Sequence, residues 1–259
     1  MPAELQSSSQ GQTLILTLRN PERRNALDPV MYAAGIEALG VAERSADIRS
    51  VIITGTDGTF CAGGNLERLL ANRQQDPAVQ AESIEGLHHW IETIRTYPKP
   101  VIAAVEGAAA GAGFSLALAC DMIVAARNAV FVMAYSNVAL SPDGGASWSL
   151  VHGLSRHMAA EILMCGDRLG AERLYALGLV NRMTEPGSAL DAALCLAQQL
   201  NARAPNALAS IKELINDAPH ATLTQQLDHE RDHIVKNLHH PNAGVGIQAF
   251  LDKREPRYE

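Results

Sequence analysis

The sequence predicts an α/β fold, with a mainly parallel sheet and helical crossovers followed by an almost wholly helical region. Short apolar runs typical of buried strands recur between helical patterns up to residue 133. Turns rich in glycine end several of these runs. Beyond residue 144 the strand pattern stops, and we expect the helical part to pack on the sheet or on a neighbouring subunit.

The first strand is predicted at residues 12–18, QTLILTL, because apolar and polar side chains alternate there. Asp28 is placed to cap a helix that begins at Pro29, since proline suits the first helical position. Residues 50–54, SVIIT, have the composition of a buried strand, which GTDG ends. The other predicted elements are helices at 79–96 and 112–120 and strands at 101–105, 121–126 and 130–133.

The composition favours a folded protein with a large core. Of the 259 residues, 47% are hydrophobic and 19% are charged. A net charge of −7 without a basic block argues against nucleic-acid binding. Residues 101–120 resemble a membrane span in length, but Glu106 and many glycines and alanines favour a buried strand and a packed helix, so no membrane partner is expected. We expect a core at residues 1–200 and a helical C-terminal region at 201–259.

The cysteines are too far apart in the sequence to form a CxxC pair, which excludes the usual pattern of a disulfide framework or a cysteine zinc site. They are Cys61, Cys120, Cys165 and Cys195. The polar start of the chain also lacks a signal-peptide pattern. Both observations predict a reducing, cytoplasmic location.

Two glycine-rich turns are candidates for ligand binding: residues 60–66, FCAGGNL, and residues 106–114, EGAAAGAGF. Glycine allows positive φ and close approach of the backbone to a ligand. The second turn opens into a helix, whose first N–H groups lack internal partners and suit an anion or a developing oxyanion. Close packing of helix on sheet also explains these glycines. A dinucleotide fingerprint is excluded, because Leu116 stands where it needs glycine.

A third segment, SPDGG at residues 141–145, places Asp143 ahead of another helix. Aspartate in that position usually caps the helix by accepting a hydrogen bond from its first turn. An ionised carboxylate is also what a general base requires. The residue pattern alone leaves both interpretations open.

Together the segments resemble the enoyl-CoA hydratase/isomerase (crotonase) superfamily. The likeness runs in order from NPERRNAL through FCAGGNL and KPVIAAVEGAAAGAGFSLALACD to the closing FLDKREP, over most of the chain. It implies a crotonase-like core, a spiral of ββα units, with a helical C-terminal region that assembles homotrimers or dimers of trimers. It also implies an acyl-CoA substrate and no separate cofactor, since coenzyme A is part of the substrate.

The resemblance places an oxyanion hole on the backbone N–H groups of Gly64 and Ala112. It implies that Lys253 reaches the CoA phosphates, either in its own chain or in a neighbouring subunit. Asn65 replaces the usual aspartate of the first motif, which we interpret as a local change of the turn. The residues that the resemblance places against CoA are Arg23, Ala26, Ala62, Gly63, Asn65, Leu66 and Lys253.

The sequence departs from the hydratases of this family at their two catalytic glutamates. Ser115 and Tyr135 stand at the matching positions, and neither side chain can act as a carboxylate base. Asp143 stands where those hydratases usually have glycine, which resembles the isomerase branch that includes the ring-opening isomerase of phenylacetate breakdown. We therefore expect a double-bond-shifting isomerase with Asp143 as its acid/base, no metal, and Tyr135 and Ser115 in the acyl pocket.

Within the same family, a hydratase-type activity is one alternative and an aryl-CoA dehalogenase is another. The dehalogenases place a nucleophilic aspartate at position 143 and need a histidine shortly before the KPV strand. Glu92 occupies the aligned position, although His88 and His89 are near. A non-catalytic acyl-CoA binder is a further alternative.

A zinc metallopeptidase is the alternative from another class. Residues 229–233, HERDH, fit the helical HExxH pattern, and His239 has the spacing of a third ligand. Lys236 replaces the glycine that the longer motif needs, and no methionine follows residue 183. The charged surroundings favour a solvated helix face over a metal site.

Overall fold

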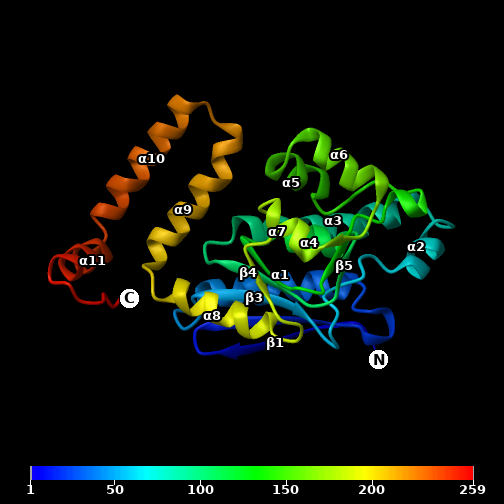
Figure 1. Ribbon diagram of the computed structural model, residues 1–259, viewed down its shortest axis with the longest axis horizontal. Helices are drawn as coiled ribbons and strands as arrows, with labels where there is room; N and C mark the ends of the chain where they lie inside the picture. The colour runs from blue at the N-terminus through cyan, green and yellow to red at the C-terminus, as the bar shows by residue number, and fades with distance from the viewer. Residues whose placement is uncertain (1, 259) are drawn as a thin grey trace.

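The computed structural model describes residues 2–258, which form a layered α/β core and a helical arm that projects from it (Figure 1). Within these residues the main sheet has six strands in the order β1-β2-β3-β4-β6-β9. β1 is antiparallel to β2, and all other neighbouring strands are parallel. The strands are β1 (Glu4–Gln10), β2 (Thr13–Arg19), β3 (Ser50–Gly55), β4 (Val101–Val105), β6 (Met122–Ala126) and β9 (Arg182–Thr184).

A smaller sheet, in the order β5-β7-β8, lies beside the first turn of α4. Its strands are β5 (Ala108–Ala110), β7 (Val130–Val132) and β8 (Leu169–Gly170). The helices of the core are α1 (Pro29–Arg44), α2 (Leu66–Asn72), α3 (Pro77–Thr96), α4 (Ala112–Ala119), α5 (Ala146–Gly153), α6 (Arg156–Cys165), α7 (Ala171–Ala176) and α8 (Ala189–Asn201). Short 3₁₀ helices are η1 (Pro21–Arg23), η2 (Ser136–Val138) and η3 (Ala218–His220). The arm consists of α9 (Pro205–Asp217), α10 (Leu223–Leu238) and α11 (Pro241–Leu251).

Both faces of the main sheet are covered, which explains why its central strands are apolar throughout. Val51 and Ile53 of β3 pack in the larger cluster with α1, α3 and α4, whereas Ile52 packs in a second cluster with α8. β4 alternates in the same way, with Ala103 on the first face and Ile102 on the second. A strand buried on both faces needs apolar side chains at every position.

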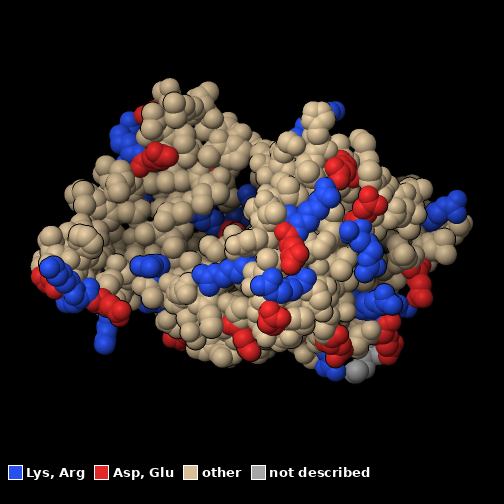
Figure 2. All heavy atoms as spheres, in the orientation of Figure 1, with Lys and Arg blue, Asp and Glu red and all other residues tan. Residues whose placement is uncertain are grey.

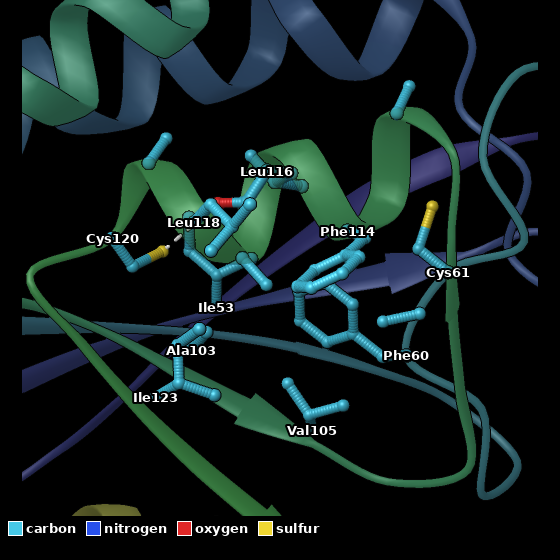
Figure 3. Close-up of a cluster of buried hydrophobic side chains, with 14 of the residues drawn as sticks. Ile53, Phe60, Cys61, Ala103, Val105, Phe114, Leu116, Leu118, Cys120 and Ile123 are labelled. Atoms are coloured by element: carbon cyan, nitrogen blue, oxygen red, sulfur yellow. Dashed lines mark hydrogen bonds between the residues drawn. The ribbon is translucent and has the colours of Figure 1, made fainter. Parts of the chain in front are cut away.

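Helix α4 is the most deeply buried helix of the core, and its eight residues are all buried. In Figure 3 the ring of Phe114 points from α4 toward the sheet and lies near Phe60. The rings of Phe114 and Phe131 are 5.0 Å apart between centroids. This packing fixes the position of the N-terminus of α4, which carries part of the candidate site.

The structure confirms the predicted elements and adds others that the sequence pattern did not reveal. Strands β8 and β9 lie beyond residue 144, so the expectation of an almost wholly helical chain there was wrong, because two- and three-residue strands are too short to show a pattern. Strand β2, strand β3 and helix α3 lie within two residues of their predicted bounds, and Asp28 caps α1 by accepting from the Val30 amide at 3.3 Å. Strand β1 was missed because its exposed ELQSSSQ sequence lacks apolar alternation. Helix α2 was missed because seven residues are too few for a helical period to show.

The arm meets the core along a seam that contains a buried ion pair. Nζ of Lys212 in α9 lies 2.8 Å from Oδ2 of Asp121 and donates to the Ile94 carbonyl at 2.9 Å. A hollow opens beside this seam (Figure 2), and its largest part is a cavity of about 530 Å³ lined by residues of α3, α5 and α9. No helix within residues 2–258 is long and apolar enough to cross a bilayer, and residues 101–120 form β4, β5 and α4.

Candidate active site

The two glycine-rich turns lie side by side. The Cys61 amide donates to the Ala108 carbonyl and the Ala110 amide donates to the Cys61 carbonyl, both at 2.9 Å. Gly63 has a φ of +92°, and a Cβ added there would lie 2.6 Å from the Ala110 oxygen and 3.4 Å from the Ala112 nitrogen. Only glycine therefore allows the first turn to approach the start of α4 this closely.

The backbone amides of Gly64 and Ala112 belong to these adjacent segments. Gly64 pairs with Leu27 in an isolated bridge, held by a 2.7 Å hydrogen bond from the Leu27 amide to the Gly63 carbonyl. Ala112 is the first residue of α4, and no side chain caps that helix. Within residues 2–258 neither amide donates a hydrogen bond to another protein atom. Both N–H groups are available to a ligand, as an oxyanion hole requires.

Three side chains beside these turns form a hydrogen-bonded chain. The Tyr135 hydroxyl donates to Oδ1 of Asp143 at 2.7 Å, and it lies 3.2 Å from Oγ of Ser115. The Tyr135 ring faces the start of α4, since a Cβ at Gly111 would lie 3.7 Å from its Cζ. The two positions that hold glutamates in hydratases thus bind one another and Asp143.

Asp143 does not cap the following helix. The N-cap of α5 is Gly145, in the left-handed region, and no side chain bonds the first turn. At the start of α5, Asp143 contributes only its main-chain carbonyl, which accepts from the Ala146 amide at 3.2 Å. The same carbonyl accepts from the Ser115 hydroxyl at 3.1 Å. The capping interpretation is therefore wrong, because the carboxylate turns toward Tyr135 instead.

The electrostatic setting keeps Tyr135 a hydrogen-bond donor. Burial raises the pKa of its hydroxyl, and the neighbouring Asp143 carboxylate raises it further. A tyrosine that stays protonated donates to the carboxylate and does not compete with it for protons. Burial likewise raises the pKa of the Cys61 thiol to about 12, which leaves that thiol unreactive at neutral pH.

The structure brings most of the expected CoA-binding residues together around the first turn. Arg23 in η1 forms an ion pair with Glu67 of α2. Ala26 is buried, and Leu66 at the start of α2 is exposed. The Asn65 side chain caps α2 by accepting from the Glu67 and Arg68 amides at 3.1 and 3.2 Å, which gives the departure at position 65 a local role. Ala62 and Gly63 form the backbone of this turn.

Lys253 does not join this group within one chain. It follows α11, which lies at the opposite end of the molecule from α2 (Figure 1). Lys253 is therefore distant from the first glycine-rich turn of its own chain. Contact of Lys253 with CoA, in its own chain or in a neighbouring subunit, stays a prediction.

Two residues that sequence reasoning did not select also lie near Asp143. Tyr32 in α1 is 4% exposed, and its hydroxyl is within electrostatic range of both Arg68 and Asp143. Position 32 lies on the apolar face of α1, and position 68 lies in α2, which the sequence pattern did not reveal. No motif marks either residue.

The HExxH pattern falls on α10, where its two histidines face the neighbouring helix. Nδ1 of His229 lies 3.6 Å from Asp217, and Nε2 of His233 lies 3.7 Å from Glu213. Within residues 2–258 no three His, Cys, Asp or Glu side chains form a group that could hold a metal ion. Each histidine has a carboxylate partner of its own and does not converge with the other on a third ligand.

Comparison with known proteins connects this geometry to one family. The family model described as enoyl-CoA hydratase/isomerase matches residues 9–259. The chain is 37% identical to a 1,2-epoxyphenylacetyl-CoA isomerase of Escherichia coli, over 95% of this chain and 94% of that protein. It is 31% identical to a 2,3-dehydroadipyl-CoA hydratase of the same organism, over 99% of both chains.

Solved structures give the same family by their shape. A crystal structure described as an enoyl-CoA hydratase from Polaromonas sp. JS666 superposes with a TM-score of 0.98 and 69% identity. That match covers 98% of this chain and 99% of the other. The names of the relatives include both isomerases and hydratases, so kinship alone leaves the reaction undecided.

Proposed function

The chain belongs to the enoyl-CoA hydratase/isomerase family, and from this premise we propose that it shifts a double bond in an unsaturated acyl-CoA. Asp143 carries the proton, and the amides of Gly64 and Ala112 hold the thioester oxygen. The observation that carries the proposal is the 2.7 Å hydrogen bond that fixes the Asp143 carboxylate beside the start of α4. No second carboxylate stands at positions 115 and 135.

The reaction needs one base and one site for negative charge. Asp143 removes a proton from C2 of a 3-enoyl thioester, and the electron pair moves into a dienolate whose charge lies on the thioester oxygen. Two N–H donors at about 2.7–3.1 Å stabilise that charge, and losing one such donor costs roughly 3–4 kcal/mol. The protonated Asp143 then returns the proton to C4, which leaves the double bond between C2 and C3.

A single carboxylate suits a shift better than a hydration. Hydration adds water across the double bond, and in this family's hydratases two glutamates handle the water and the proton. Here the matching side chains, Ser115 and Tyr135, bond to each other and hold Asp143 in place. A general acid–base group of this kind contributes about 10²–10⁴-fold to the rate.

The isomerase of Escherichia coli is named for a ring-epoxide thioester, which adds a second substrate class to the proposal. We propose that the chain accepts 3-enoyl-CoA or ring-epoxide thioesters. An epoxide next to an acidic C2–H reacts through the same thioester enolate, so both substrates use the same hole and the same base.

We also propose that the protein is a homotrimer or a dimer of trimers. Helix α10 has no buried residue, and large apolar side chains on one stripe of it are exposed. Their spacing of four, seven and four residues is that of one helix face. The residues of this stripe are Leu223, Leu227, Ile234 and Leu238. Exposed apolar area of this extent marks a surface that a partner covers.

The proposal is tested with 3-hexenoyl-CoA, 2-hexenoyl-CoA and a ring-epoxide thioester, with products followed by chromatography and mass. Isomerisation keeps the mass, whereas hydration adds one water. Asp143→Asn should lower turnover at least about 100-fold while binding of a CoA thioester persists. Asp167→Asn, at an exposed position, is the matched control. Full activity of Asp143→Asn, or hydration as the main wild-type reaction, would refute the proposal.

A further inference from the structure

Asp143 is held at two points by side chains from two different segments. The Ser115 hydroxyl in α4 donates to the main-chain carbonyl of Asp143 at 3.1 Å, and the Tyr135 hydroxyl donates to Oδ1 of its carboxylate at 2.7 Å. The loop also lies directly on α4, because a Cβ added at Gly144 would lie 3.0 Å from Cβ of Ser115. The backbone of Asp143 and one of its carboxylate oxygens are therefore both fixed.

Tyr135 is itself fixed at both ends. Its main-chain carbonyl accepts from the amides of Val138 and Leu140 at 3.1 and 3.0 Å. Its side chain lies against the start of α4, since a Cβ added at Gly111 would lie 3.7 Å from its Cζ. The hydroxyl is also 3.2 Å from Oγ of Ser115, a residue that is only 1% exposed. The Tyr135 hydroxyl therefore stays in place when the Asp143 side chain moves.

The two carboxylate oxygens of Asp143 have different surroundings. Oδ1 accepts from Tyr135, whereas within residues 2–258 no group donates to Oδ2. Oδ2 is not sealed in the protein interior and is open to solvent. The last torsion of an aspartate side chain is soft, so that without a partner the two oxygens readily turn and exchange places. The hydrogen bond to Tyr135 opposes this rotation and leaves Oδ2 as the oxygen that faces a ligand.

We propose that Tyr135 is a positioning residue that makes Asp143 a one-oxygen shuttle, in which Oδ2 removes the proton from C2 and returns the same proton to C4. The inference rests on the proposed function, because it concerns the proton that Asp143 moves. The C2–H bond breaks as an O–H bond forms at Oδ2, and that O–H bond breaks as the C4–H bond forms. The carboxylate ends as it began, and no water takes part.

Tyr135 controls this transfer without joining it. Burial raises the pKa of its hydroxyl, and the Asp143 carboxylate raises it further. The hydroxyl therefore keeps its proton and does not mix it with the one that moves. With Oδ1 held, the migrating proton reaches water only if the protonated carboxyl group turns away from the acyl group. Loss of the Tyr135 hydroxyl permits that rotation, so we expect the proton to be exchanged with water more often.

The test follows the migrating atom with an isotope. The substrate is 3-hexenoyl-CoA that carries two deuterons on C2, and mass spectrometry at low conversion in ordinary water measures how much product keeps both. The wild-type protein should keep the migrating deuteron, on C4, in more than about half of the product. In Tyr135→Phe this fraction should fall at least about threefold and kcat about tenfold, with KM within about twofold of wild type.

The isotope ratio separates positioning from damage to the fold. A variant that is partly unfolded makes less product, but the product that it makes keeps the wild-type ratio. Tyr175→Phe, at an exposed tyrosine in α7, is the matched control and should keep both the ratio and kcat. The remaining substrate and a sample without enzyme are measured too, so that exchange at C2 before the shift is subtracted. Thermal unfolding shows whether each variant is folded.

Two results would overturn the inference. One is a wild-type product that has lost the migrating deuteron completely, a result that needs no variant. The other is equal retention in the wild-type protein and in Tyr135→Phe. In both cases the double bond still shifts, so the proposed function stands. A wild-type protein that forms no isomer at all would instead refute the proposed function, and this inference with it.

Discussion

The core and the arm use apolar side chains in opposite ways. In the core, all eight residues of α4 are buried between the sheet and its covering helices. In the arm, α10 has no buried residue, and Phe250 of α11 is 83% exposed. The core is complete within one chain and builds the candidate site from its own turns. The arm exposes an apolar surface that one chain leaves uncovered. The apolar side chains of the core therefore stabilise the fold of one chain, whereas those of the arm are placed to contact a partner.

The largest effect is expected from charged substitutions on the apolar stripe of α10, which should change the oligomeric state. Leu227→Glu combined with Ile234→Glu places two charges on the apolar stripe of α10, and each lost apolar contact is worth about 2 kcal/mol. We expect the assembly to dissociate to monomers in light scattering. Lys236→Glu, on another face of α10, should leave the mass unchanged. A wild-type protein that is already monomeric, or a double variant of unchanged mass, would show that the stripe is not an interface.

The seam between arm and core should depend on its buried ion pair. Lys212→Met leaves the Asp121 carboxylate buried without its cation, which should cost about 3 kcal/mol of unfolding free energy. Adding Asp121→Asn should restore part of the loss, because an amide carries no uncompensated charge. Thermal unfolding measures both. A Lys212→Met variant as stable as wild type would mean that other contacts hold the seam together.

The same carboxylate should give Lys212→Met a distinctive pH dependence. Burial is the main cause that raises the pKa of Asp121 above 3.8, and Lys212 opposes it. With a raised folded-state pKa, the folded protein binds more protons than the unfolded chain above pH 3.8. Stability from this group is therefore present at low pH and lost as pH rises. Removing the cation should steepen this loss. Urea midpoints at pH 4.5 and 7 check it, and no steeper decline than in wild type would contradict it.

In the core, the close approach of the two turns should tolerate no extra atom. Gly63→Ala puts a Cβ between the Ala110 carbonyl and the Ala112 amide and should lower activity about 100-fold, or about 2.7 kcal/mol. Gly187→Ala is the matched control, because it also has positive φ but nothing within 4 Å. It should keep its activity and lose only a little stability. A Gly63→Ala variant as active as Gly187→Ala would contradict the prediction that the close approach of the turns is needed for activity.

The smallest effect separates buried from exposed thiols. Cys165 and Cys195 are exposed, whereas Cys61 and Cys120 are buried and burial raises the pKa of both thiols. Iodoacetamide at pH 8 should label the two exposed cysteines within minutes and the two buried ones only after unfolding. Peptide mass mapping identifies the sites. Rapid labelling of Cys61 in the folded protein would show that the core is open near the candidate site.

The sequence predicted most of the core because its signals are local. Alternation at residues 12–18 and the apolar run at 50–54 each specify a strand without reference to the rest of the chain. The Tyr135–Asp143 hydrogen bond and the position of Tyr32 depend on how α1, α3 and the loop before α5 pack, and no spacing in the sequence encodes that. The oxyanion-hole roles that we propose for Gly64 and Ala112 came from the family resemblance, because a glycine pattern alone does not assign them.

The central claim is that one thioester oxygen meets two backbone amides beside one carboxylate. A crystal structure with a bound saturated acyl-CoA tests it most directly. We predict that the thioester oxygen lies about 2.7–3.1 Å from the nitrogens of Gly64 and Ala112, with the Asp143 carboxylate facing C2 or C4 of the acyl group. A thioester oxygen that bonds neither amide, or an acyl chain that runs away from Asp143, would contradict the account.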